Sequence, residues 1–364
     1  MRATTLTGLA FFLFACGAES AAPEPPATTE ADEPQESQEA AEPTAPEVDT
    51  AYAIHEWGFI AHHYADEESL LTSGTAPAAE RVPPTQIPRG HVNSRAVGKP
   101  VIYVHLQGEG NIARFHASLS TTGRFLEEWP HSEDSTATSL TWDVEARRGS
   151  CSARGNYPVA ADSHCSGIAD RYCEAAELAN YETEDSACLT VDGEEWNHLF
   201  YRAQVAGDVP LRLSKSGDAF TVHGSGALPG RLMRIRRADD ASGTRVALFD
   251  APAAGESLSI PAAPHQPAAV GIAALEAELS ALGLSDAEVE AFMIAWQAEL
   301  FGDTAERTQV EMLGSPPRDL RPKADALIYF LPTATLDAMV PFTFTPPPTE
   351  VRRAVLVRVD LGEG

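Results

Sequence analysis

The chain has 364 residues and is strongly acidic: 53 Asp and Glu residues stand against 26 Lys and Arg residues, and the formal charge at pH 7 is −27. Such a charge repels nucleic-acid phosphates and anionic lipid headgroups, so we expect no nucleic-acid partner. The length is sufficient for two or three domains, each with a hydrophobic core of its own.

The first 15 residues have the features of a bacterial export signal. Arg2 supplies the positive charge, and residues 6–15 form an apolar run that is too short for a membrane span of about 20 residues. The stretch LFAC at 13–16 resembles the bacterial lipobox, in which the cysteine is lipidated after cleavage. We therefore predict a lipoprotein signal peptide at 1–15 and lipidation of Cys16. An ordinary signal peptide with a chance cysteine is the alternative.

The next segment, residues 16–50, is predicted to be a disordered tether of Ala, Pro, Glu, Thr and Gln residues. From residue 17 onward it has ten acidic residues and no basic residue, so it has too little apolar surface to fold alone. An acidic docking tail is the alternative. Gly17, in place of the Asp that marks inner-membrane retention, favours the outer membrane. We therefore expect a lipid-anchored protein of the bacterial cell envelope whose body faces the periplasm or the cell surface.

Residues 51–147 are predicted to form a first β domain. The stretch YAIHEWGFIAHH at 52–63 has the β-branched and aromatic content of a strand. Its alternation places His55, Trp57 and Phe59 on one face. Further strands are expected at 101–106, 112–119 and 139–146.

Residues 148–198 are predicted to be a cysteine-rich insert with a short helix at 171–181. Once Cys16 is assigned to lipid, an even number of cysteines remains in an exported chain, which favours two disulfides. The spacing lacks the close CxxC pairs of a zinc site. The four cysteines are Cys151, Cys165, Cys173 and Cys188. They allow three pairings, of which the sequential one, Cys151 with Cys165 and Cys173 with Cys188, is favoured because its loops are short.

The rest of the chain changes from strand to helix periodicity and back. Residues 199–265 are predicted to form a second β-sandwich domain, because short strands recur about every 10 to 15 residues with Gly, Asp and Ser between them. Residues 266–364 are predicted to be a helical pair and C-terminal strands that pack on the body, with Ser285 and Glu288 as a capping box. The expected fold class is mainly β, of the α+β type. It has two antiparallel β-sandwich-like modules, a disulfide-bearing insert, and a C-terminal helical hairpin with strands.

Four motifs are distinctive: IHEWGF at 54–59, KPVIYV at 99–104, LFYR at 199–202 and LIYFLP at 327–332. With these motifs the chain resembles a family of uncharacterised exported bacterial proteins whose mature domain opens with His-Glu-Trp-Gly. The resemblance spans residues 54–361, which is the body without the tether. The family has no established activity, so the resemblance implies neither a catalytic residue nor a ligand.

Histidines gather in the first β domain, which holds seven of the eleven in the chain. Imidazole is the commonest protein ligand for zinc and copper, and neighbouring strands bring side chains onto one ion. The candidate metal ligands are His55, Glu56, His62, His63 and His105. Hydrogen-bonded or solvent-facing histidines are the alternative, because HEWGF lacks the second histidine of the HExxH motif.

A structural role for the same motif is also open, and we favour it. Trp57 would then anchor the core, while Glu56 would bond to backbone or to an arginine such as Arg202. No GxSxG, P-loop, Rossmann or SxxK motif occurs, so we predict no catalytic residue and no cofactor, apart from zinc at the histidine cluster. We expect a non-catalytic envelope protein that binds a protein or glycan partner or acts as a scaffold. The alternative is a metal-dependent hydrolase with its site in the first β domain.

Overall fold

The chain divides into two compact units, Met1–Ala45 and Pro46–Gly364, and the computed structural model describes residues of the second unit only. The described residues are 49–63, 95–132, 134–152, 157, 174–205, 210–216, 219–224, 226–237, 243–261, 264–302 and 325–361. Within them no helix is long and apolar enough to cross a bilayer. The predicted signal peptide, Cys16 and most of the tether lie outside these residues.

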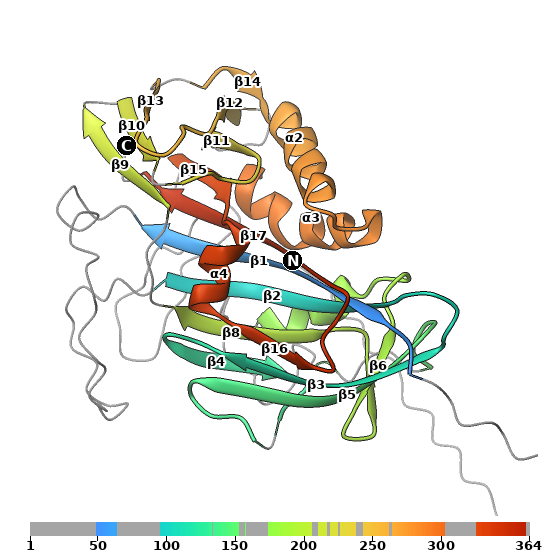
Figure 1. Ribbon diagram of the computed structural model, residues 1–364. Helices are drawn as coiled ribbons and strands as arrows, with labels where there is room; N and C mark the ends of the chain where they lie inside the picture. The colour runs from blue at the N-terminus through green and yellow to red at the C-terminus, as the bar shows by residue number, and fades with distance from the viewer. Residues whose placement is uncertain are drawn as a thin grey trace, which may run out of the picture. The chain divides into compact units, whose positions relative to one another are not determined.

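The fold is mainly β, as predicted, and its largest part is a nine-stranded sheet. The strand order is β14-β12-β11-β15-β17-β1-β2-β8-β4 (Figure 1). In that order the strands are Gln266–Pro267, Arg245–Asp250, Arg231–Arg236, Asp325–Phe330, Glu350–Asp360, Tyr52–His63, Arg95–Leu106, Leu199–Val205 and Arg124–Trp129. Strands β1 and β17 pair in parallel, and the other pairs in this sheet are antiparallel.

The two central strands are buried on both faces. Every residue from Tyr52 to Ile60 in β1 is buried, and so is every residue from Arg353 to Asp360 in β17. Such a position requires a nearly continuous apolar run rather than strict alternation, and AVLV at 354–357 supplies one. The few polar residues that interrupt these two strands must therefore find partners inside the protein.

Two smaller sheets complete the β structure. One has the order β16-β3-β5-β6-β7, and the other has the order β13-β10-β9. The strands of the first are Phe342–Thr345, Ile112–Ser120, Ser139–Arg147, Cys188–Val191 and Glu194–Trp196. Those of the second are Ser257–Ile260, Ala219–Gly224 and Leu211–Ser216. A 3-10 helix, η1, spans Glu174–Tyr181 within the predicted helical stretch of the insert.

The sheets cross the boundaries that the sequence predicted between modules. Strands β1, β2 and β4 from residues 51–147 share the nine-stranded sheet with β8, β11 and β12 from residues 199–265. Strand β16, near the C-terminus, pairs with β3. Strand patterns show which residues are half-buried but not which strands pair, because pairing joins residues far apart in the chain.

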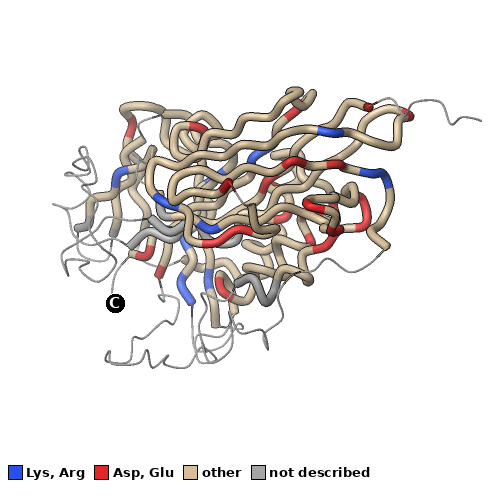
Figure 2. Tube along the Cα trace, turned by 90° about the horizontal axis from the view of Figure 1, so that it is seen from below, with Lys and Arg blue, Asp and Glu red and all other residues tan. Residues whose placement is uncertain are grey.

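The predicted helical pair is α2 (Ala268–Ala281) and α3 (Asp286–Phe301), which pack against each other and against the sheet (Figure 1). The predicted capping box at the start of α3 is confirmed. A third helix, α4 (Thr333–Met339), follows β15 and contacts β17. Acidic and basic residues are interspersed along the traced body, as Figure 2 shows.

Candidate functional site

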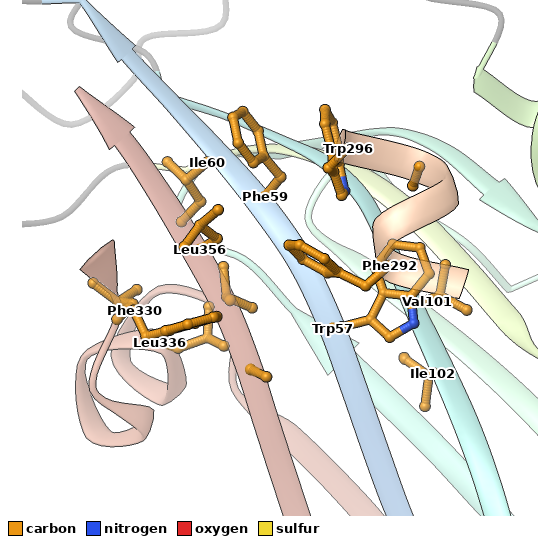
Figure 3. Packing of buried hydrophobic residues seen from close by; sticks show 14 of the residues in the cluster. Trp57, Phe59, Ile60, Val101, Ile102, Phe292, Trp296, Phe330, Leu336 and Leu356 are labelled. Atoms are coloured by element: carbon orange, nitrogen blue, oxygen red, sulfur yellow. The ribbon is translucent and has the colours of Figure 1, made fainter. Parts of the chain in front are cut away.

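Helix α3 packs lengthwise on one face of β1, and this packing creates the site. Trp57 lies edge-on to Phe292 with ring centroids 5.6 Å apart, and Phe59 stacks on Trp296 at 4.1 Å (Figure 3). Two residues along a strand advance by about 6.8 Å and four residues along a helix by about 6 Å. Residues spaced by two in β1 therefore remain opposite residues spaced by four in α3. The next pair in the series, one turn toward the start of α3, is polar: His55 meets Glu288.

His55, His105 and Glu288 form a compact cluster. The Nδ1 atom of His55 lies 3.1 and 3.0 Å from the two carboxylate oxygens of Glu288. The Nε2 atom of His105 lies 2.8 Å from Oε1 of the same carboxylate, and the two imidazole rings are 4.3 Å apart. Each residue thus offers one ligand atom to the same small volume, and these atoms all lie within 4.8 Å of one another.

Three separate elements position this cluster. His55 and His105 come from the paired strands β1 and β2, where His105 is opposite Ala53, two residues before His55. Glu288 is the third residue of α3, and its Oε2 accepts the backbone N–H of Ser285 at 2.8 Å. The capping box therefore fixes the carboxylate at the point where the helix begins, directly over the strands.

The electrostatics of the cluster are governed by the burial of Glu288. Burial would raise the pKa of this carboxyl group, but hydrogen bonds from His105 and His55 outweigh it and lower the pKa to about 2. Burial likewise works to lower the pKa of His105, yet the hydrogen bond to Glu288 outweighs it and raises the pKa above its ordinary value. The carboxylate is ionised at neutral pH, and it needs a positive group beside it.

Of the five predicted metal ligands, the structure brings His55 and His105 together. The side chains of His62 and His63 lie outside what the structure describes. Glu288 was missed as a ligand, although it could have been noticed: it falls on the apolar stripe of α3, four residues before Phe292, where a charged side chain is unusual.

Glu56 does not join the histidines, because alternation along β1 turns it to the opposite face of the sheet. Its Oε2 accepts the Nε–H of Arg353 at 2.5 Å, and its Oε1 accepts the Tyr201 hydroxyl at 2.6 Å. Arg353 also donates to Asp337 at 2.6 Å and to the carbonyl of Val340 at 2.8 Å, which ties α4 to β17. The partner of Glu56 is therefore not Arg202, the arginine suggested by the sequence.

The cysteine pairing differs from the favoured sequential one, because Cys151 is bonded to Cys188. Arg147 at the end of β5 is opposite Cys188 at the start of β6, so the antiparallel pairing of these strands brings Cys188 next to the residues that follow β5. Cys165 and Cys173 lie outside the described residues. Glu195 is near the bonded pair, but cysteines in a disulfide have no free thiolate for a metal.

A second histidine is buried without being part of the cluster. The ring of His198 stacks on Tyr157 at 4.5 Å and is fully buried. Neither ring nitrogen has a hydrogen-bond partner within the described part of the chain. Burial lowers the pKa of His198 to about 3, so the ring is neutral at pH 7.

Helices α2 and α3 border an open groove of about 740 Å³ on the solvent side. Its apolar lining includes Val289, Met293 and Ile294, and the Ile294 side chain is prominent because the residue is 56% exposed. The charged residues in the described part of the lining are all acidic: Glu276, Asp286 and Glu290.

No protein-family model matches the chain, and no curated protein matches it. Among solved structures, the Mu homology domain of Fcho1 from Danio rerio, determined with a bound Eps15 peptide, aligns over 85% of this chain and 96% of its own length. The two chains are 10% identical and superpose with a TM-score of 0.28. A similarity of this size carries no information about function.

Proposed function

We propose that this chain is a lipid-anchored protein of the bacterial cell envelope whose body binds a protein partner rather than catalysing a reaction. The lipobox ending in Cys16 and the acidic tether support the anchoring, since together they would hold a folded body away from the outer membrane. The disulfide between Cys151 and Cys188 is in keeping with an oxidising compartment.

The groove between α2 and α3 is the observation that carries the binding role. Helix α3 is apolar toward the sheet through Phe292 and Trp296, and apolar toward the groove through Met293 and Ile294. A surface helix ordinarily places polar residues on its outer face, so an exposed isoleucine beside a wide apolar lining marks an interaction surface.

The chemistry of the groove indicates what kind of partner fits. An apolar floor accepts hydrophobic side chains, and the acidic residues Glu276, Asp286 and Glu290 attract Lys and Arg residues flanking them. We infer an amphipathic basic segment of another protein as the occupant, laid between the two helices. A glycan fits less well, because among the described residues of the lining the only aromatic ring for stacking is that of Phe301, which is only 2% exposed.

Site-specific photo-crosslinking in intact envelopes tests this proposal. A photoreactive residue at Ile294 should give a discrete crosslinked adduct, and the same residue at Val351, an exposed valine of β17 outside the groove, should not. Adding Glu290→Lys to the Ile294 probe should weaken the adduct, because it reverses a charge of the lining. Equal labelling from both positions, or no adduct from Ile294, contradicts the proposal.

The hydrogen-bond partners and the burial of Glu56 argue against a catalytic role for this residue. Its two carboxylate oxygens bond to Arg353 and Tyr201, and the side chain is fully buried. A general base needs access to the proton that it removes, and Glu56 has none.

A metal-dependent hydrolase is the second candidate, and one observation favours it: two imidazoles and one carboxylate converge in the cluster of His55, His105 and Glu288. Zinc hydrolases use such three-residue sets and keep a fourth position for water. Metal binding by this cluster would not by itself make the protein a hydrolase.

A further inference from the structure

We propose that His55, His105 and Glu288 form a binding site for one divalent transition-metal ion, with zinc the best-fitting ion. This site lies on the sheet side of α3 and does not depend on the groove or on the lipid anchor. The metal-site proposal therefore stands even if the groove binds no partner or Cys16 carries no lipid.

The donor set selects the class of ion. Two imidazole nitrogens and one carboxylate oxygen suit zinc and its neighbours in the first transition row. Calcium requires six to eight oxygen ligands, and magnesium favours oxygen ligands with several retained waters, so neither fits a site with two nitrogens. Three protein ligands leave one position of a tetrahedral ion for water or for another small ligand.

The distances in the cluster are close to those of a metal site. An ion bound tetrahedrally at about 2.0 to 2.1 Å separates its ligand atoms by about 3.3 to 3.4 Å. In the cluster, Nδ1 of His55 is 3.0 Å from the nearer oxygen of Glu288, and Nε2 of His105 is 2.8 Å from the other. Each of these nitrogen–oxygen pairs needs to separate by only a few tenths of an ångström to admit the ion, and all three ligand atoms lie within 4.8 Å of one another.

The charge balance of the cluster also favours a cation. Glu288 is fully buried, and the nearby guanidinium group of Arg352 bonds instead to the carbonyl of Gly283 and to Glu350. The imidazole rings of His55 and His105 lie 4.3 Å apart on the exposed side of this carboxylate. A divalent ion held between them would supply a positive charge beside the buried Glu288.

The backbone of Asp185 lies beside His105. Besides facing Glu288, the imidazole of His105 is close enough to this backbone for it to favour the protonated ring. Metal-bound histidines ordinarily donate their other ring N–H to a carbonyl or carboxylate, which fixes the ring orientation and the tautomer. The Asp185 backbone would serve this purpose for His105.

An ion can reach the cluster from the histidine side. The His105 side chain is 18% exposed and that of His55 is 11% exposed, whereas Glu288 is not exposed at all. The carboxylate therefore forms the buried side of the site, and the two histidines form the side from which solvent and an ion have access.

The test is a titration of the tag-free, metal-stripped full chain with Zn²⁺ by calorimetry and with Co²⁺ by visible absorption. We expect about one equivalent of either ion, and a tetrahedral or five-coordinate Co²⁺ spectrum. Glu288→Gln and His105→Asn should each weaken binding by about 100-fold or more, since losing even an outer-shell partner costs 10- to 100-fold. Glu290→Gln, an exposed change on the same helix, and His116→Asn, an exposed histidine of β3, are the matched controls and should bind as the unchanged chain does.

His105→Asn decides the outcome if Glu288→Gln does not fold, because His105 is partly exposed and its loss leaves the capping box intact. Circular dichroism of each variant shows whether it is folded. The proposal is overturned if the unchanged chain binds no saturable equivalent of either ion. It is equally overturned if folded His105→Asn binds within about three-fold of the unchanged chain.

Discussion

Glu56 and Arg353 form a fully buried ion pair across the parallel strands β1 and β17, with 2.5 Å between Oε2 and Nε. The two residues are register partners at the centre of the nine-stranded sheet. Arg353 is also within 3.8 Å of the Phe342 ring centroid and bonds to Asp337. This pair joins the first and last strands of the described chain, and it explains why a charged residue follows His55 in a buried strand.

Glu56→Gln should destabilise the fold, because it leaves the buried charge of Arg353 without its main partner. Breaking one side of a buried pair typically costs about 3 to 5 kcal/mol. Glu145→Gln, which removes one member of the exposed pair with Arg114, should cost about 1 kcal/mol or less. Urea unfolding of both variants measures the difference. Equal losses would mean that the buried pair has no special role.

Cys16→Ala should abolish membrane attachment, because Cys16 alone combines a preceding apolar run with a small residue at the adjacent position. Expressed in a bacterial host, the unchanged chain should incorporate labelled fatty acid and sediment with membranes, and the variant should do neither. Continued labelling of the variant would show that the lipoprotein assignment is wrong.

Because Cys151 is bonded to Cys188, we predict that Cys165 pairs with Cys173. Trypsin and a glutamate-specific protease together place the four cysteines on separate peptides. Non-reducing mass spectrometry should then recover Cys151 linked to Cys188 and Cys165 linked to Cys173. A peptide that links Cys151 to Cys165 would restore the sequential pairing, and alkylation before reduction would reveal free thiols.

His198 should make stability fall with acid. Its pKa is about 3 in the folded protein, because burial disfavours the charged ring, and about 6.5 when unfolded. Below pH 6.5 the unfolded state binds a proton that the folded state does not, so stability is complete above that pH and is lost toward pH 3. Between these two pKa values, His198 should lower the free energy of unfolding by up to about 1.4 kcal/mol for each pH unit of acidification.

His198→Phe is the matched variant, since it keeps the stacking on Tyr157 and removes the titration. The free energy of unfolding, measured between pH 7 and pH 4, should fall less steeply in the variant than in the unchanged chain. Identical slopes would show that another group controls the acid response.

The sequence predicts the local features of the fold well where they depend on neighbouring residues. The strand at 52–63, the helical pair and the capping box of Ser285 with Glu288 all follow from periodicity and cap chemistry. Strand pairing is different: Glu56 meets Arg353 across 297 positions, and no local pattern carries that information. For the same reason, the sequence does not reveal that strands of the two expected modules share one sheet.

The candidate site was partly predictable for the same reason. Histidine enrichment pointed to His55 and His105, which lie on two strands of the predicted first β domain that pair in the structure. Strand alternation alone could have excluded Glu56 from the candidate metal ligands, since adjacent residues of a strand point to opposite faces of the sheet. The position of Glu288 on the apolar stripe of α3 marks it as unusual, but only the tertiary structure pairs it with His55, which lies 233 positions away.

The central claim, that the cluster of His55, His105 and Glu288 binds a metal ion, is tested most directly by diffraction from zinc-soaked crystals of the full chain. Data collected on both sides of the zinc absorption edge should give one anomalous peak at about 2.0 to 2.2 Å from Nδ1 of His55, Nε2 of His105 and the Glu288 carboxylate. The peak should be absent from crystals of His105→Asn. A map with no peak at the cluster, with His105 and Glu288 still in direct contact at 2.8 Å, would contradict the claim.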